Sequence, residues 1–292
     1  MSEIVKNCPL CGGENSRQFD QRKFRGQVVI NRICQRCGLV YHSPRMTEEE
    51  ASAFYQAEYR RMYQGEEGPI ARDFFTQTAR AESLSAFVQP HISAITSHLD
   101  IGCSTGLILQ HFKKQYGCLP VGIEPGEAYR AYARQQGLTV YASLEELEKK
   151  TKERFALISM SHVLEHLADP VGYLVHLREE FLEPQGWLLL EVPNLYAHDS
   201  FEVAHLLAFS PHTLREVLRR SGFTIIKFEK HGRPNSLILP LFLTVLCRPA
   251  VSPDHSPVRP EKGVTLKRQT GMLWRRILSR LFPKRAWLTQ GK

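Results

Sequence analysis

The sequence predicts an α/β fold, in which helices cover both faces of a mostly parallel β-sheet. Its 292 residues are enough to bury a sizeable core. Hydrophobic residues make up 42% and charged residues 23% of the chain, which excludes a wholly disordered protein. From residue 97 onward, short apolar segments alternate with helical segments, and this pattern is typical of βαβ units.

The last two predicted strands differ from the others. Residues 223–229 and 238–247 follow each other with no helix between them, so we expect this pair to be antiparallel. The preceding strands are expected at 98–101, 120–124, 139–141, 155–160 and 187–192, and the helices at 107–115, 127–136, 165–181 and 211–221.

The chain divides into four expected parts. Residues 1–45 form a cysteine-containing ribbon, and 46–95 form a helical connector or lid with an N-cap at Thr47. Residues 96–250 form the α/β domain, and 251–292 form a basic tail that begins with a proline-rich linker.

The net charge of +8 resides in the tail. Residues 251–292 contain ten Lys or Arg and two acidic residues, so residues 1–250 hold 28 basic and 28 acidic side chains. No apolar run reaches the roughly 18 residues of a membrane-spanning helix, and the N-terminus lacks the apolar segment of a signal peptide. We therefore expect a cytoplasmic protein with reduced cysteines, whose tail alone has the charge to attract a membrane or nucleic acid.

Two CxxCG motifs near the N-terminus indicate a metal site. They are Cys8-Pro-Leu-Cys11-Gly and Cys34-Gln-Arg-Cys37-Gly, separated by 22 residues. The glycine after each pair permits a tight turn with positive φ, and four thiolates suit tetrahedral Zn²⁺. A redox pair is the alternative, but it would need only one CxxC on a thioredoxin-like unit. Because no ligand position is left open, the predicted zinc is structural.

A glycine-containing turn between the first strand and helix predicts a nucleoside site. It runs Asp100-Ile-Gly102-Cys103-Ser-Thr-Gly106, and Glu124 follows at the end of the next strand, where a carboxylate can bind both ribose hydroxyls. The turn lacks the GxGxxG pattern of NAD-binding proteins and the lysine of phosphate-binding loops. A nucleoside without a pyrophosphate therefore fits best.

These segments resemble the motifs of class I S-adenosylmethionine-dependent methyltransferases. The residues that carry the resemblance are Leu99–Gly106, Glu124, Ser161–Pro170 and Pro184–Asn194, in the family's order. The zinc ribbon is similar to that of a subgroup that includes sugar C-methyltransferases. The resemblance implies a Rossmann-like, seven-stranded sheet in the order 3-2-1-4-5-7-6 with strand 7 antiparallel.

The resemblance also implies how the cofactor, S-adenosylmethionine, is held. The turn formed by Asp100, Gly102, Cys103 and Gly106 would bind its methionine part, and Glu124 its ribose. Ser161 and His162 would lie along it. Many members carry an acidic adenine contact after strand 3, where Tyr141-Ala-Ser143 offers only a hydroxyl.

Two histidines are candidate catalytic residues. His205 follows the fifth strand, where sugar C-methyltransferases carry a Glu-His pair, but Ala204 stands in place of the glutamate. His166 follows the fourth strand. Each is either a general base or a packing or positioning group. Tyr55 and Tyr59, four residues apart, either close over the cofactor as a lid or pack on the sheet.

The sequence thus predicts a methyltransferase with a small-molecule acceptor, namely a nucleotide-sugar or a glycan or lipid precursor. The alternatives are an RNA methyltransferase and a non-catalytic cofactor-binding module. In the tail, residues 271–288 read as a short amphipathic helix with an apolar half and an arginine half. We expect it to contact anionic lipid at the inner face of the membrane, with packing on protein or nucleic acid as alternatives.

Overall fold

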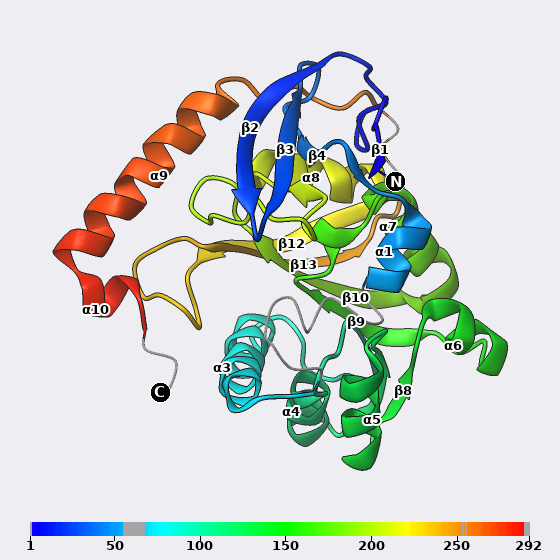
Figure 1. Ribbon diagram of the computed structural model, residues 1–292. Coiled ribbons are helices and arrows are strands. Elements are labelled where there is room, and N and C mark those ends of the chain that lie inside the picture. The colour runs from blue at the N-terminus through cyan, green and yellow to red at the C-terminus, as the bar shows by residue number, and fades with distance from the viewer. Residues whose placement is uncertain (1, 55–67, 253, 255, 289–292) are drawn as a thin grey trace.

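The computed structural model describes residues 2–54, 68–252, 254 and 256–288, so Tyr55 and Tyr59 lie outside the described residues. Figure 1 shows a central sheet with helices on both sides, a small N-terminal sheet above it, and a C-terminal helix along the outside.

The central sheet has seven strands in the order β8-β7-β6-β9-β10-β13-β12. All neighbouring pairs are parallel except those of β13, which is antiparallel to both β10 and β12. In chain order this is 3-2-1-4-5-7-6, so the expected fold is confirmed. The strands are β6 (Ser97–Ile101), β7 (Leu119–Ile123), β8 (Thr139–Tyr141), β9 (Phe155–Ser161), β10 (Leu182–Pro193), β12 (Phe223–His231) and β13 (Phe242–Pro249).

Two apolar clusters attach the helices to opposite faces of this sheet. One joins α3 and α4 to β9, β10 and β13, and the other joins α6, α7 and α8 to β6, β9 and β10. A smaller cluster packs α5 beside α4. The helices are α3 (Ala71–Val88), α4 (Leu107–Tyr116), α5 (Glu127–Gln135), α6 (Leu144–Lys150), α7 (Pro170–His176) and α8 (Pro211–Arg220).

Prolines shift two elements from their expected bounds. The helix expected at 165–181 is split into a 3₁₀ turn at Leu164–His166, α7, and a π turn at Leu177–Phe181. Pro170 disfavours helical backbone at Asp169, which instead caps α7 by accepting a hydrogen bond from Gly172 N at 2.9 Å. The strand expected from residue 238 begins at 242, because Pro240 has no N–H to donate.

The N-terminal ribbon is joined to the α/β domain. Its strands β2 (Ser16–Phe24) and β3 (Gln27–Cys34) form an antiparallel hairpin, which β4 (Val40–His42) extends by one strand. The fourth strand of this sheet, β11 (Leu207–Ala208), belongs to the segment after β10. Apolar ribbon residues, including Leu39 and Tyr41, share one cluster with α6, α7 and α8. The ribbon and the domain therefore have a common core.

Short elements connect the ribbon to the first long helix. Strand β1 (Ser2–Glu3) pairs with β5 (Arg45–Met46), and α1 (Glu48–Ala53) follows. The expected N-cap is present, because Thr47 Oγ1 accepts a hydrogen bond from Glu50 N at 3.2 Å and the Glu50 carboxylate accepts one from Thr47 N at 3.0 Å.

The tail forms helices α9 (Val264–Leu281) and α10 (Pro283–Ala286). The preceding linker contains no helix or strand among its described residues, but it is not a free tether. Arg219 of α8 pairs with Asp254 at 2.9 Å, and His212 contacts the Arg259 carbonyl at 2.8 Å. In the described part of the chain, no helix has the length and apolar character to span a membrane.

Candidate active site

A cleft of about 450 Å³ lies at the carboxyl edge of the sheet, where parallel α/β folds bind their ligands. The loops after β6, β7, β8 and β9 form most of its wall, and α3 closes one side. Lining residues include Gln77, Arg80, Gly102, Ser104, Glu124, Ser143, Glu145, Ser161, His162 and His166.

The turn after β6 has the backbone conformation that its glycines predict. Gly102 has φ +75°, and a Cβ there would lie 2.6 Å from Val163 Cγ2. Ser104 also has positive φ, at +51°, a strained conformation for a residue with a side chain. The turn consequently brings its backbone close to the cleft.

The Glu124 carboxylate is fixed by two backbone amides. Its Oε2 accepts a hydrogen bond from Ser104 N and its Oε1 one from Gly126 N, both at 2.9 Å. Glu124 is buried but lines the cleft. Since each carboxylate oxygen has a second lone pair, both oxygens can accept another hydrogen bond from a ligand hydroxyl.

Beneath the turn, Asp100 ends a buried polar chain. Ser159 Oγ donates a hydrogen bond to Asp100 Oδ1 at 2.5 Å and lies 2.7 Å from His98 Nε2. Burial raises the pKa of Asp100 to about 7, although the Ser159 hydrogen bond opposes this. Asp100 Oδ2 and Ser161 Oγ are buried without a hydrogen-bond partner among the described residues. Ser161 also lines the cleft and can therefore bond a polar ligand there, whereas Asp100 lies beneath the turn.

The residues singled out from the sequence fall into two groups. Gly102, Glu124, Ser161, His162 and His166 line the cleft. Asp100, Cys103, Gly106 and His205 are outside its described lining. The Cys103 side chain is buried and packs under the turn against Gly122.

Sequence reasoning missed several lining residues. Gln77 and Arg80 come from α3, whose position on the cleft is set by tertiary packing and has no local signal. Glu145 supplies an acid after the third strand in chain order, two residues beyond the segment that we considered. The sequence Ser143-Leu-Glu-Glu is an N-cap signal, and Ser143 Oγ does accept a hydrogen bond from Glu146 N at 3.3 Å. This pattern predicts that a helix starts at Leu144, and in the structure the start of α6 lines the cleft.

His162 lies between two buried glutamates. Its Nδ1 is 3.3 Å from Glu165 Oε1, and its Nε2 is 3.5 Å from Glu191 Oε1. Burial raises the pKa of Glu165, but His162 and the neighbouring imidazoles outweigh it and lower the value to about 2. His162 has φ +57°, so a second strained residue borders the cleft.

The two candidate catalytic histidines are in contact, with ring centroids 4.8 Å apart. His166 Nδ1 lies 2.9 Å from the Ala204 carbonyl oxygen, and His205 Nδ1 lies 2.9 Å from that of Ser200. His205 Nε2 pairs with Glu202 at 2.9 Å. Glu202, three residues before His205, therefore supplies the carboxylate partner that the alanine at position 204 does not.

The two rings have different proton affinities. Burial and the nearby His205 lower the pKa of His166 to about 4, which keeps it neutral at pH 7. Burial also acts to lower the pKa of His205, but Glu202 outweighs it and raises the value. With Nδ1–H donated to Ala204, the basic atom of neutral His166 is Nε2.

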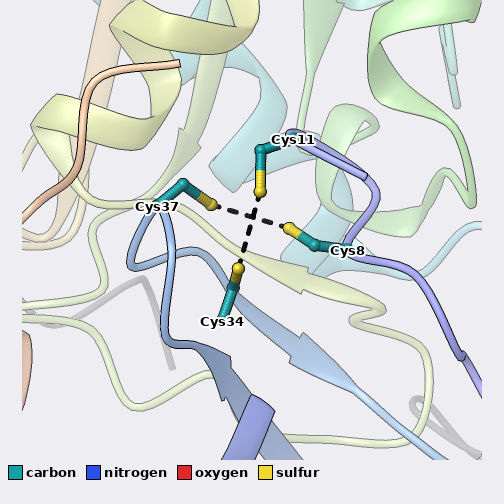
Figure 2. Close-up of side chains that lie close together, drawn as sticks. All are labelled: Cys8, Cys11, Cys34 and Cys37. Carbon is teal, nitrogen blue, oxygen red and sulfur yellow. Dashed lines mark hydrogen bonds between the residues drawn. The ribbon is translucent and has the colours of Figure 1, made fainter. Parts of the chain in front are cut away.

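The four ribbon cysteines converge as their spacing predicts (Figure 2). The Sγ atoms of Cys8 and Cys37 are 3.6 Å apart, as are those of Cys11 and Cys34. Tetrahedral Zn²⁺ with bonds of about 2.3 Å requires sulfur–sulfur distances of about 3.8 Å. Gly12 and Gly38 have the expected positive φ, +68° and +86°. The donor set thus fits a closed zinc site.

Comparisons with known proteins agree with this architecture. A family model described as a methyltransferase domain matches residues 53–227. The ubiquinone biosynthesis O-methyltransferase of Histophilus somni is 31% identical over 157 residues, which cover 49% of this chain and 63% of that protein. Its counterpart in Cereibacter sphaeroides is 30% identical over 132 residues, covering 43% and 53%. The matched region thus spans less than two thirds of these relatives.

Among solved structures, 1,6-didemethyltoxoflavin-N1-methyltransferase of Burkholderia thailandensis has the same fold. The TM-score is 0.57 at 20% identity, with 79% of this chain and 99% of that chain covered. The family match extends over more than half of the chain, and the strand order is the one that the resemblance implied. The chain therefore belongs to the family of the methyltransferase domain.

Proposed function

We propose that this protein transfers a methyl group from S-adenosylmethionine to a hydroxyl group of a small organic acceptor. The observation that carries the proposal is that one cleft contains both a carboxylate suited to a ribose, Glu124, and a half-buried neutral imidazole, His166.

The cleft offers a partner for each part of the cofactor. Glu124 would bind the ribose hydroxyls, and Ser143 and Glu145 border the position for the adenine. The turn at Gly102 and the buried oxygen of Asp100 would hold the methionine part. Arg80, on the cleft wall, would offer its guanidinium to the carboxylate of the cofactor's methionine part. When bound, the cofactor supplies an electrophilic methyl group, and the residues around it orient that group and exclude water.

On the acceptor side, His166 is the better candidate for the general base. It lines the cleft, and the Ala204 carbonyl fixes its ring in the tautomer that accepts a proton at Nε2. The Glu165 carboxylate beside it would stabilise the imidazolium that forms. Both nitrogens of His205 already have partners, Ser200 and Glu202, so we assign it a positioning role.

A base is needed only for a protonated acceptor, so this arrangement favours a hydroxyl. The two curated relatives described above are named O-methyltransferases, which supports the same choice. Nucleotide-sugars and lipid precursors with free hydroxyls remain within the proposed acceptor class.

The direct test is transfer of radiolabelled methyl groups to separate pools of hydroxylated aromatic compounds, nucleotide-sugars, lipid extracts and total RNA. We expect label in a hydroxylated small molecule, as a base-stable methyl ether. Labelling of RNA alone would contradict the proposal, as would cofactor binding without transfer to any pool.

Glu124→Ala should weaken S-adenosylmethionine binding at least tenfold, because each of its two hydrogen bonds to the ribose would contribute about 1.5–3 kcal/mol. Isothermal titration calorimetry measures this effect. Glu127→Ala is the matched control, since its carboxylate is exposed three residues further along the chain. An equal dissociation constant for the wild type and Glu124→Ala would refute the assignment.

His166→Gln should lower kcat by roughly 10² to 10⁴ without weakening cofactor binding. His205→Gln should cost less than tenfold in kcat, because this residue acts through His166. The exposed His91 provides the control variant His91→Gln. A larger loss for His205→Gln than for His166→Gln would reverse the two roles.

We also propose that Cys8, Cys11, Cys34 and Cys37 hold one structural Zn²⁺ ion. Because the ribbon shares a core with the α/β domain, Cys11→Ser should remove the zinc and lower the melting temperature of the whole chain in a single transition. Cys118→Ala, at a buried thiol outside the cluster, should retain the metal. Elemental analysis that finds no zinc in protein purified without chelator would disprove the site.

A further inference from the structure

The tail helix α9 contacts the protein body through its arginines. Arg268 is buried and donates to the carbonyl oxygens of Leu195 and His198, and Arg275 donates to that of Ala197. These carbonyls belong to the segment that follows β10. At Gly271 a Cβ would lie 2.0 Å from the Tyr196 carbonyl oxygen, so the helix is seated against this segment.

The opposite face of α9 is apolar and exposed. Leu273, Trp274 and Leu281 have exposed fractions of 55%, 62% and 66%, and Leu266 has 65%. At about 100° per residue, these side chains and Ile277 fall within an arc of about 100° on the helix. We name these five residues the outer stripe. Phe282 and Trp287, just beyond α9, are exposed as well.

Basic side chains flank the outer stripe. Arg276 and Arg280 are exposed on one side, Lys267 is exposed on the other, and Lys284 and Arg285 follow in α10. No Asp or Glu occurs after Glu261. The sequence predicted a helix with an apolar half and an arginine half; in the structure Arg268 and Arg275 face the protein body, and the outer stripe is left exposed.

We propose that the outer stripe is a docking surface for an anionic lipid bilayer. Exposed leucines and a tryptophan flanked by cations match the interfacial region, where apolar side chains enter the acyl boundary and basic side chains meet lipid phosphates. A second copy of the chain is disfavoured, because two such faces would bring like charges together. Nucleic acid is disfavoured, because its phosphates would border aliphatic side chains that need a dry environment.

The segment on which α9 rests lies near the cleft wall. The segment held by Arg268 and Arg275 contains His198, whose ring lies 5.6 Å from that of Phe242. The Phe242 ring is in turn 5.1 Å from that of His162 on the cleft wall. These ring contacts link the segment on which α9 rests to the wall of the cleft. The docking itself does not depend on the proposed methyl transfer.

Co-sedimentation of the full chain with vesicles tests this surface without cofactor or acceptor. We expect binding to vesicles of phosphatidylcholine mixed with phosphatidylglycerol, and much weaker binding to phosphatidylcholine alone or at high salt. Leu273→Ser/Leu281→Ser and Arg276→Gln/Arg280→Gln should each reduce binding about tenfold or more. Leu119→Ser, at a leucine that is 70% exposed elsewhere, should bind like the wild type. Point variants are preferable to truncation, which would also remove the Arg268 contacts.

Unchanged melting temperatures would show that these variants remain folded. The proposal is overturned if the stripe variant binds vesicles like the wild type, or if both vesicle types bind equally. It is also overturned if the surface proves to bind an RNA oligomer and no vesicles, or to form a dimer that Leu273→Ser/Leu281→Ser dissolves.

Discussion

The elements around the cleft at the carboxyl edge of the sheet are held together by the buried carboxylate of Glu191. It lies on β10, an interior strand between β9 and β13, and is 1% exposed. Arg80 of α3 pairs with it at 2.9 Å, and Thr244 of β13 donates a hydrogen bond to it at 2.9 Å. His162 and His231 approach it at 3.5 and 3.3 Å. A carboxylate so deeply buried is tolerated only with several partners, so its charge fixes four elements around the cleft. Removing Arg80, whose guanidinium is always charged, would leave the carboxylate without its permanent counter-charge.

A second buried junction ties the outer parts of the chain to this framework. The Glu261 carboxylate accepts hydrogen bonds from Tyr196 Oη at 2.6 Å and Ser210 Oγ at 2.5 Å, while its backbone N–H donates to the Cys37 carbonyl at 3.1 Å. The zinc ribbon, the segment after β10 and the start of the tail therefore meet at one residue. Parts of the chain from both ends of the sequence are thus joined to the α/β domain at this one residue.

Most of the correct predictions came from local sequence patterns. Apolar periodicity located the strands, the two CxxCG motifs located a convergent cysteine cluster, and the turn from Asp100 to Gly106 located the cleft. The contacts that were missed join distant residues, as Arg80 does with Glu191. The Glu202–His205 pair was missed for another reason: only a known Glu-His motif was sought, whereas a turn brings residues i and i+3 together. Apolar periodicity shows which side of a helix or strand is apolar, but tertiary contacts determine what that side packs against.

The tail illustrates that last limit in energetic terms. An amphipathic helix on a globular body ordinarily buries its apolar stripe, because burial stabilises by about 25 cal/mol per Å². Here the segment after β10 presents carbonyl oxygens and the Asp199 carboxylate, which contacts Arg268 at 3.2 Å and Arg22 at 2.7 Å. Those oxygen atoms accept hydrogen bonds from guanidinium groups but provide no apolar surface against which a leucine could pack. Arg268 and Arg275 consequently take the inner face beside this segment, and the outer stripe is left in contact with water. Exposure of these apolar side chains to water is unfavourable for the isolated chain. A partner that is apolar inside and negatively charged at its surface would remove them from water and pair with the flanking cations.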